Sequence, residues 1–271
     1  MKMISKIILI TVLLSAISIC GLELWTISKQ YTDEARITDE ISRYRPELPK
    51  SQNSSKTSGD FPDRPFDVSD MSFQDESNHP GAPIRGINQS IADIQNDINT
   101  DIVGWLTIPN TRIDYPIVIA GDNDFYLRRN IYKQPATAGS IFMDFRCARD
   151  FTDINTVIYG HNMKNRSMFG SLKLFADPGF FESNTTGTLF AKDNTYIFEI
   201  FAYMVVRSDD KLIFDPSADR EQLFEYAQNY ARRYRTPAAS GNVITLSTCA
   251  YDYDGARMVL LGVIICPIIN E

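Results

Sequence analysis

The feature that most constrains the fold is a series of short apolar runs, rich in β-branched and aromatic residues, that begins at Gly104. Turn-forming residues separate the runs, which is typical of strands. About eight such runs favour a closed barrel, because closure leaves no strand edge exposed. The sequence therefore predicts a mainly β fold built on a closed eight-stranded barrel. The predicted strands are residues 105–108, 113–118, 140–144, 156–159, 188–191, 195–206, 242–248 and 257–266.

Helical patterns interrupt and precede the strands. Residues 219–235 begin with an approximate capping box of Asp219 and Gln222 and end before Pro237, which predicts an inserted helix. Its apolar stripe is Leu223, Ala227, Tyr230, Ala231 and Tyr234. A short helix is expected at residues 168–176. An N-terminal helix on the outside of the domain is predicted from Ile87, Ile91, Ile94 and Ile98, which recur at helical spacing.

Residues 1–30 are expected to anchor the chain in a membrane. The stretch 7–27 carries no charge except Glu23 and is long enough to cross a bilayer as a helix. Lys2 and Lys6 precede it, so the positive-inside rule places the rest of the chain outside the cell. The sequence thus predicts a single-pass protein of the cell membrane with an extracellular domain. A cleaved signal peptide is the alternative.

Residues 31–83 are expected to form an extracellular stalk and a flexible spacer, which leaves 84–271 as the folded domain. The part from 46 to 83 is rich in Pro, Ser, Asp and Asn and has almost no aliphatic periodicity, as is typical of spacers. Residues 33–45 alternate in charge and are expected to continue outward as a short helix. His79 lies within the spacer and is interpreted as a solvated residue without a role in the chemistry.

Composition argues against several kinds of site. A formal net charge of -7 disfavours nucleic-acid binding, which depends on clustered Lys and Arg. The folded part has one histidine and no CxxC pair, so no metal site is expected, and no cofactor either. With Cys20 in the expected anchor, Cys147, Cys249 and Cys266 remain outside. This odd number leaves at least one exported thiol free unless chains pair with each other.

Cys249 is the candidate nucleophile. It ends the run 242–249 and precedes the turn-forming stretch 250–255. A thiol at the end of a strand is partly exposed and held on a rigid element, which suits a reactive group. The alternative is a small buried core residue, which is the common environment of an unpaired cysteine.

His161 and Arg257 are the candidate partners of this thiol. His161 follows the predicted strand 156–159 and is the only histidine in the folded part, so any cysteine-histidine chemistry must use it. Arg257 begins the strand after Cys249 and lies near the sulfur if the two strands pair as a hairpin. A cation there would favour the thiolate and could hold an oxyanion. The alternatives are a structural histidine and a solubilising surface arginine.

These residues lie within longer runs that resemble a known family. TLSTC at 245–249, with Arg257 eight residues later, and VIYGHN at 157–162 are similar to the motifs of sortases. Further runs resemble class B sortases in particular, and the resemblance covers roughly two-thirds of the chain. It implies a sortase-type barrel with an N-terminal helix and an inserted helix before the catalytic strand. The class B runs are residues 102–109, 113–118, 139–144 and 161–172.

The resemblance implies a cysteine transpeptidase. Sortases cleave a C-terminal sorting motif of exported proteins through a thioacyl intermediate and transfer the acyl end to a peptidoglycan amine. The motif expected here is of the Asn-Pro-x-Thr or Pro-x-Thr type. Cys249 would be the nucleophile, His161 the proton-transfer group and Arg257 the stabiliser of the oxyanion. By the same resemblance, the substrate-binding residues would be Ser247, the backbone N–H of Ala250, Asn123 and Leu127.

Two other functions remain open from the sequence. A secreted cysteine peptidase or amidase would share the thiol and the histidine, but its cysteine usually begins a helix rather than ending a strand. A non-enzymatic anchored binding module would use the barrel only as a scaffold, and would leave the coincidence of Cys249, His161 and Arg257 unexplained.

Overall fold

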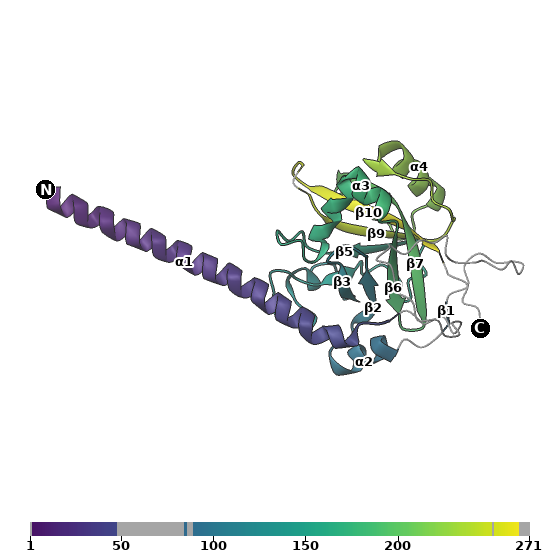
Figure 1. Cartoon of the computed structure of the whole chain (residues 1–271), viewed down its shortest axis with the longest axis horizontal. Helices are drawn as coiled ribbons and strands as arrows, with labels where there is room; N and C mark the ends of the chain where they lie inside the picture. Colours follow the sequence, from purple (N-terminus) through teal and green to yellow (C-terminus); the bar gives the residue numbers. More distant parts are fainter. Residues whose placement is uncertain (1, 48–83, 86–88, 251, 266–271) are drawn as a thin grey trace, which may run out of the picture. The chain divides into compact units, whose positions relative to one another are not determined.

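The structure is a computed structural model with two compact units, Met1–Arg43 and Tyr44–Glu271 (Figure 1). Residues 48–83 of the expected spacer, which include His79, fall outside the described residues, as do Ile87 and Cys266. The residues that the structure describes are 2–47, 84–85, 89–250 and 252–265.

The first unit is the long helix α1 (Lys2–Ile41), which the short 3-10 helix η1 (Ser42–Tyr44) follows. The junction expected at residue 30 between anchor and stalk lies inside this continuous helix. Within the described part of the chain, no helix is both long and apolar enough to cross a membrane. The anchor at residues 1–30 therefore stays a prediction from the sequence.

The second unit contains a closed barrel of eight strands, as the sequence predicts. The hydrogen-bonded order is β7-β10-β9-β5-β4-β3-β2-β6, and pairing of β6 with β7 closes the ring. Two short strands, β1 (Ile84–Arg85) and β8 (Arg233–Tyr234), also pair with β7. The barrel strands are β2 (Ile102–Thr107), β3 (Asp114–Val118), β4 (Ile141–Met143), β5 (Asn155–Tyr159), β6 (Thr186–Ala191), β7 (Asn194–Arg207), β9 (Val243–Cys249) and β10 (Ala256–Ile265).

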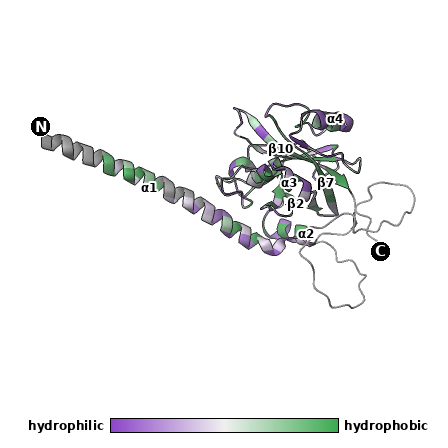
Figure 2. Ribbon diagram, turned by 45° about the horizontal axis from the view of Figure 1, so that its top comes forward, coloured by the Kyte–Doolittle hydropathy of each residue, from purple (hydrophilic) through white to green (hydrophobic). Residues whose placement is uncertain are grey.

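Strand β10 is buried on both faces, which explains why its sequence is apolar without alternation. Met258 and Leu260 belong to the main core cluster, whereas Val259 and Leu261 belong to a second cluster with Leu223 of the helix α4 (Arg220–Tyr230). Because successive side chains of a strand point to opposite faces, a strand covered on both sides needs apolar residues at every position. Figure 2 shows hydrophobic residues along β7 and β10 and mostly hydrophilic ones on α4.

The inserted helix is present but ends earlier than predicted. Asp219 caps α4 as expected, with its side chain accepting a hydrogen bond from the N–H of Gln222 at 3.0 Å. The chain then becomes extended at Ala231, because the strand β8 that follows pairs with β7. Tyr230 is 69% exposed, so the expected apolar stripe is wrong at this position.

Shorter helices cover other parts of the barrel. The predicted outer helix is α2 (Gln89–Asp97), in which Ile91 and Ile94 are fully buried. The helix expected at 168–176 is the 3-10 helix η4 (Phe169–Ala176). It leads into a further helix that the sequence analysis missed, α3 (Pro178–Ser183). Its local signals were an Asp at the N-cap and a Pro in the first turn.

Candidate active site

Cys249 lies where the sequence analysis placed it, at the end of a barrel strand. It is the last residue of β9, its side chain is exposed, and in the β9–β10 hairpin it pairs directly with Arg257. An antiparallel pair brings the Cβ atoms of opposite residues within about 5.5 Å of each other. The hairpin thus places a cation beside the thiol.

The turn of this hairpin already uses one of the expected oxyanion donors. The backbone N–H of Ala250 donates to the carbonyl oxygen of Ala256 at 2.9 Å, and Nη1 of Arg257 donates to the same oxygen at 3.0 Å. A backbone amide has one hydrogen, so in this structure Ala250 has none left for a substrate. A guanidinium has five N–H donors, so Arg257 keeps others. The role expected for Ala250 stays a prediction, and it requires this hydrogen bond to open.

His161 follows the end of β5, next to the end of β9 that carries Cys249, because β5 and β9 run parallel. Tyr159 pairs with Ser247, so the residues two positions further along each strand leave the barrel at the same end. The N–H of Gly160 donates to the carbonyl of Ser247 at 3.1 Å, and Nδ2 of Asn162 donates to the carbonyl of Cys249 at 2.8 Å. These bonds join the loop that carries His161 to the strand end that carries the thiol.

The imidazole of His161 has its own partner. Its Nε2 lies 2.6 Å from the carbonyl oxygen of Leu127. The sequence analysis expected Leu127 to contact substrate, but the structure shows its backbone in contact with the histidine. No local sequence pattern could reveal this contact, because a backbone carbonyl has no sequence signature.

Asn123, the other residue expected to bind substrate on this loop, uses both ends of its amide within the protein. Nδ2 donates to Asp144 Oδ2 at 3.0 Å, and Oδ1 accepts from the N–H of Phe145 at 3.1 Å. The side chain therefore holds the loop to the end of β4. The structure gives no support for direct substrate binding by this amide.

Asp144, which the sequence analysis did not single out, is the centre of a buried polar cluster. Its side chain is fully buried, and it accepts from Nε and Nη2 of Arg146 at 2.8 Å each and from the hydroxyl of Tyr159 at 3.0 Å. Burial alone would raise the pKa of this carboxyl, but the hydrogen bonds, led by those from Arg146, hold its pKa below the ordinary value. The only sequence signal was an acidic residue directly after an apolar strand.

Ser247 does not reach the surface. It is 1% exposed, and its Oγ has no hydrogen-bond partner within the described residues. The expectation that it lines the substrate groove is therefore not supported in this state of the protein.

The second cysteine of the barrel has a different environment. Cys147 is buried, its sulfur accepts a hydrogen bond from the N–H of Val157 at 3.5 Å, and burial raises its pKa to about 12. Such a thiol is inert as a nucleophile near neutrality. Among the cysteines described in the barrel unit, the exposed one is Cys249.

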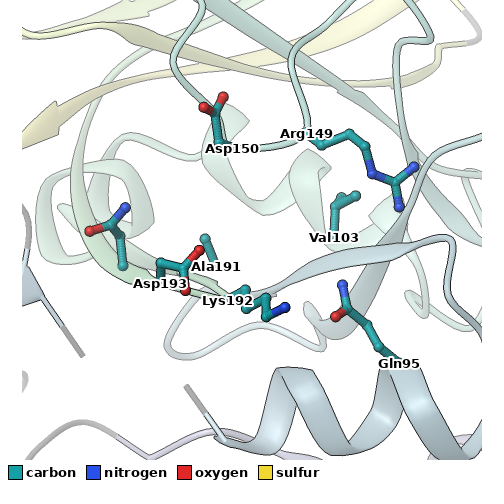
Figure 3. A pocket seen from close by; sticks show the side chains of 8 residues that line it. Gln95, Val103, Arg149, Asp150, Ala191, Lys192 and Asp193 are labelled. Carbon is teal, nitrogen blue, oxygen red and sulfur yellow. The ribbon is translucent and has the colours of Figure 1, made fainter. Parts of the chain in front are cut away.

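A cavity lies between α2, the start of β2 and the turn that joins β6 to β7 (Figure 3). Charged residues of both signs line it, and Cys249 is not among its lining residues. The cavity therefore takes no part in chemistry at this thiol. Its lining residues are Gln95, Val103, Arg149, Asp150, Ala191, Lys192, Asp193 and Asn194.

Comparison with known proteins gives consistent matches. The sortase-domain family model matches residues 106–264, a range that contains Cys249, His161 and Arg257. The chain is 39% identical over 183 residues to Sortase B of Listeria monocytogenes. The alignment covers 65% of this chain and 74% of that protein.

Solved structures agree with this match. Sortase B from Bacillus anthracis in complex with AAEK1 has a TM-score of 0.60 at 34% identity, covering 68% of this chain and 88% of that one. The Staphylococcus aureus sortase B-substrate complex has a TM-score of 0.61 at 25% identity, covering 66% of this chain and 86% of that one.

Proposed function

The chain belongs to the sortase family, in its class B branch, and we propose that Cys249, His161 and Arg257 carry its transpeptidase chemistry. The observation that supports these roles best is the meeting of two strand ends. Parallel β5 and β9 bring the histidine beside the thiol, and the β9–β10 hairpin pairs the thiol with the arginine.

In the first half of the reaction, the thiolate of Cys249 attacks the carbonyl carbon of the threonine in a sorting motif. A carbon–sulfur bond forms, and the carbonyl oxygen becomes an oxyanion beside the guanidinium of Arg257. The carbon–nitrogen bond then breaks. His161, as imidazolium, gives its proton to the departing amine, and a thioester remains on the enzyme.

In the second half, an amine of the cell wall attacks the thioester. A new amide bond forms, the carbon–sulfur bond breaks, and the proton of the attacking amine passes to His161. This returns the imidazolium and the thiolate to their starting states, so the same histidine is acid in one half and base in the other. Net transfer of the acyl group needs no metal and no redox partner.

Arg257 is the better placed of the two expected oxyanion donors. Its side chain is half-buried beside the thiol and keeps unused N–H groups in addition to the one bound by Ala256. The single N–H of Ala250 becomes available only if its bond to Ala256 breaks. We therefore assign oxyanion stabilisation to Arg257.

The substrate proposed is an exported protein with a C-terminal sorting signal of the Asn-Pro-x-Thr or Pro-x-Thr type, and the acceptor is a peptidoglycan amine. The assignment to class B supports this, and one relative of known structure is a substrate complex. Attachment of this enzyme to the cell membrane through residues 1–30, with an extracellular domain, rests on the sequence pattern alone. Fractionation of cells producing the full chain and a chain without residues 1–30 tests the attachment.

The activity is tested with the full-length chain, a quenched peptide that carries an Asn-Pro-x-Thr motif, and a soluble amine. We expect cleavage and a peptide joined to the amine. Cys249→Ala should abolish both, and Arg257→Ala should slow both by roughly a hundredfold or more, as for loss of an oxyanion donor. Cys147→Ala is the matched control and should keep activity. Persistent turnover by Cys249→Ala would contradict the assignment of Cys249 as the nucleophile.

A further inference from the structure

The hydrogen bond between His161 and Leu127 decides which ring nitrogen can exchange a proton. The carbonyl oxygen of Leu127 can only accept, so Nε2 of His161, 2.6 Å away, must donate. In the neutral ring the other nitrogen, Nδ1, then has the free lone pair. A proton-transfer histidine whose second nitrogen is fixed in this way keeps one tautomer and one orientation.

The segment that presents this carbonyl is held at its start by Asn123. Its side-chain amide donates a hydrogen bond to the buried carboxylate of Asp144 and accepts one from the N–H of Phe145. Asp144 is in turn fixed by Arg146 and by the hydroxyl of Tyr159, which is two residues before His161. The start of the segment and the strand that carries the histidine therefore share one buried carboxylate.

The end of the segment is held by Tyr126, which is 1% exposed. Its hydroxyl donates to Asp101 Oδ2 at 2.6 Å and accepts from Nδ2 of Asn99 at 2.7 Å. Burial and the bond to Asp101 raise the pKa of Tyr126, so the hydroxyl keeps the proton that it donates. The residue directly before Leu127 is thus fixed by two polar partners.

A glycine packs against the carbonyl from outside the segment. Gly139 has a φ of +58°, and a Cβ built on it would lie 2.5 Å from the oxygen of Leu127 and 2.8 Å from that of Tyr126. The next N–H, that of Ser140, donates to the oxygen of Tyr126 at 3.0 Å. A side chain at Gly139 would therefore push on the oxygen that accepts from His161.

From these contacts we propose that residues 123–127 form a clamp that positions His161, so that its proton is exchanged at Nδ1. Asn123 and Tyr126 are positioning residues within this clamp, Gly139 supports it from outside, and none of the three needs to touch substrate. The inference deepens the proposed function, since it rests on His161 as the proton-transfer group.

The ring nitrogens of His161 can be observed directly. The chain has two histidines, so His79→Gln leaves a single imidazole for ¹⁵N NMR of the full-length protein. In this background the test variants are Tyr126→Phe, which removes the hydroxyl, and Gly139→Ala, which crowds the carbonyl. Tyr126→Phe alone tests the clamp if the glycine variant does not fold.

Matched controls make the same changes away from the histidine. Tyr226→Phe removes a hydroxyl that donates to Asp210 at 2.8 Å, and Gly187→Ala places a Cβ against the ring of Phe198. Both change the same kinds of group, at positions that share no described hydrogen bond with His161 or Leu127, and so control for a general loss of stability. Neither should change the imidazole signals or the rate constants.

The parent protein should show the neutral ring protonated at Nε2. Tyr126→Phe should give a mixture of tautomers and lower kcat roughly tenfold with little change in KM, as expected when a reacting group is misplaced. A ring protonated at Nδ1, or a Tyr126→Phe protein with unchanged tautomer and kcat, would overturn the clamp. If the parent shows the expected tautomer but no transpeptidation, the proposed function fails and the clamp stands.

Discussion

At the scale of single residues, environment separates Cys147 and Cys249, the two barrel cysteines among the described residues. Cys249 ends a strand and is exposed, whereas burial raises the pKa of Cys147 to about 12. A thiol reacts as the thiolate, so exposure and ionisation decide which sulfur can attack a carbonyl. The sequence pattern favoured Cys249 correctly as the exposed thiol.

Alkylation should reveal this difference. Iodoacetamide added to the native protein at neutral pH is expected to modify Cys249 within minutes and to leave Cys147 unmodified until the barrel unfolds. Peptide mapping by mass spectrometry measures each site separately, and denatured protein serves as the control. Equal labelling of the two in the native state would contradict the burial described here.

Asp144 is expected to contribute to stability in a pH-dependent way. Its pKa is lowered in the folded state, so its contribution is complete well above the ordinary value of 3.8 and is lost as the pH falls through the folded value. Asp144→Asn should lower the free energy of unfolding by roughly 2 kcal/mol at pH 7, since it removes the negative charge that pairs with Arg146. Arg146 is partly exposed, which keeps this figure at the low end for a broken ion pair.

Urea unfolding at several pH values measures this effect. The difference between the parent protein and Asp144→Asn should shrink as the pH falls below about 3.8. A difference that stays constant down to pH 2 would show that the carboxylate's charge does not contribute.

At the scale of elements, the arrangement of the strands could be predicted only in part. Apolar runs rich in β-branched and aromatic residues, separated by turn residues, located all eight barrel strands, and the short connection from Cys249 to Arg257 suggested their hairpin. The parallel pairing of β5 with β9 joins segments about 90 residues apart in the chain. Local sequence patterns contain no information on such pairing. The placement of His161 near Cys249 therefore came from the family resemblance and from the structure.

The clamp illustrates the same limit. Its bonds join residues 34 positions apart in the case of His161 and Leu127, and 21 positions apart in the case of Asn123 and Asp144. The family resemblance assigned Asn123 and Leu127 to substrate binding, while the structure shows them bonded within the protein. A hydrogen bond to a backbone carbonyl depends on the fold and not on the identity of the accepting residue.

The cap of α4 gives a prediction for an element. Asp219→Ala removes the acceptor for the N–H of Gln222 and should lower the free energy of unfolding by about 1 kcal/mol. Thermal unfolding measures the loss, and Asp219→Asn is the control that keeps a capping oxygen. Because α4 covers the outer face of β7 and β10, the turnover of a sorting peptide should not change. A loss of activity without a loss of stability would show that the helix acts in the reaction.

At the scale of the whole molecule, the closed barrel is a rigid frame that brings the ends of β5, β9 and β10 together. The reaction proposed for it uses side chains only. Among the described residues, no group of three or more His, Cys, Asp or Glu side chains could hold a metal ion. Because the proposed reaction uses side chains only, a chelator such as EDTA should leave the rate of peptide cleavage unchanged, and a loss of activity that calcium or zinc restores would contradict this.

The central claim is that Cys249 forms a covalent acyl intermediate. Intact-protein mass spectrometry of the full chain mixed with a sorting-motif peptide, without an amine acceptor, tests it directly. The account predicts an added mass equal to the peptide fragment that ends in threonine, located on Cys249 and released when an amine is added. No adduct on an enzyme that still turns over, or an adduct that persists in Cys249→Ala, would contradict it.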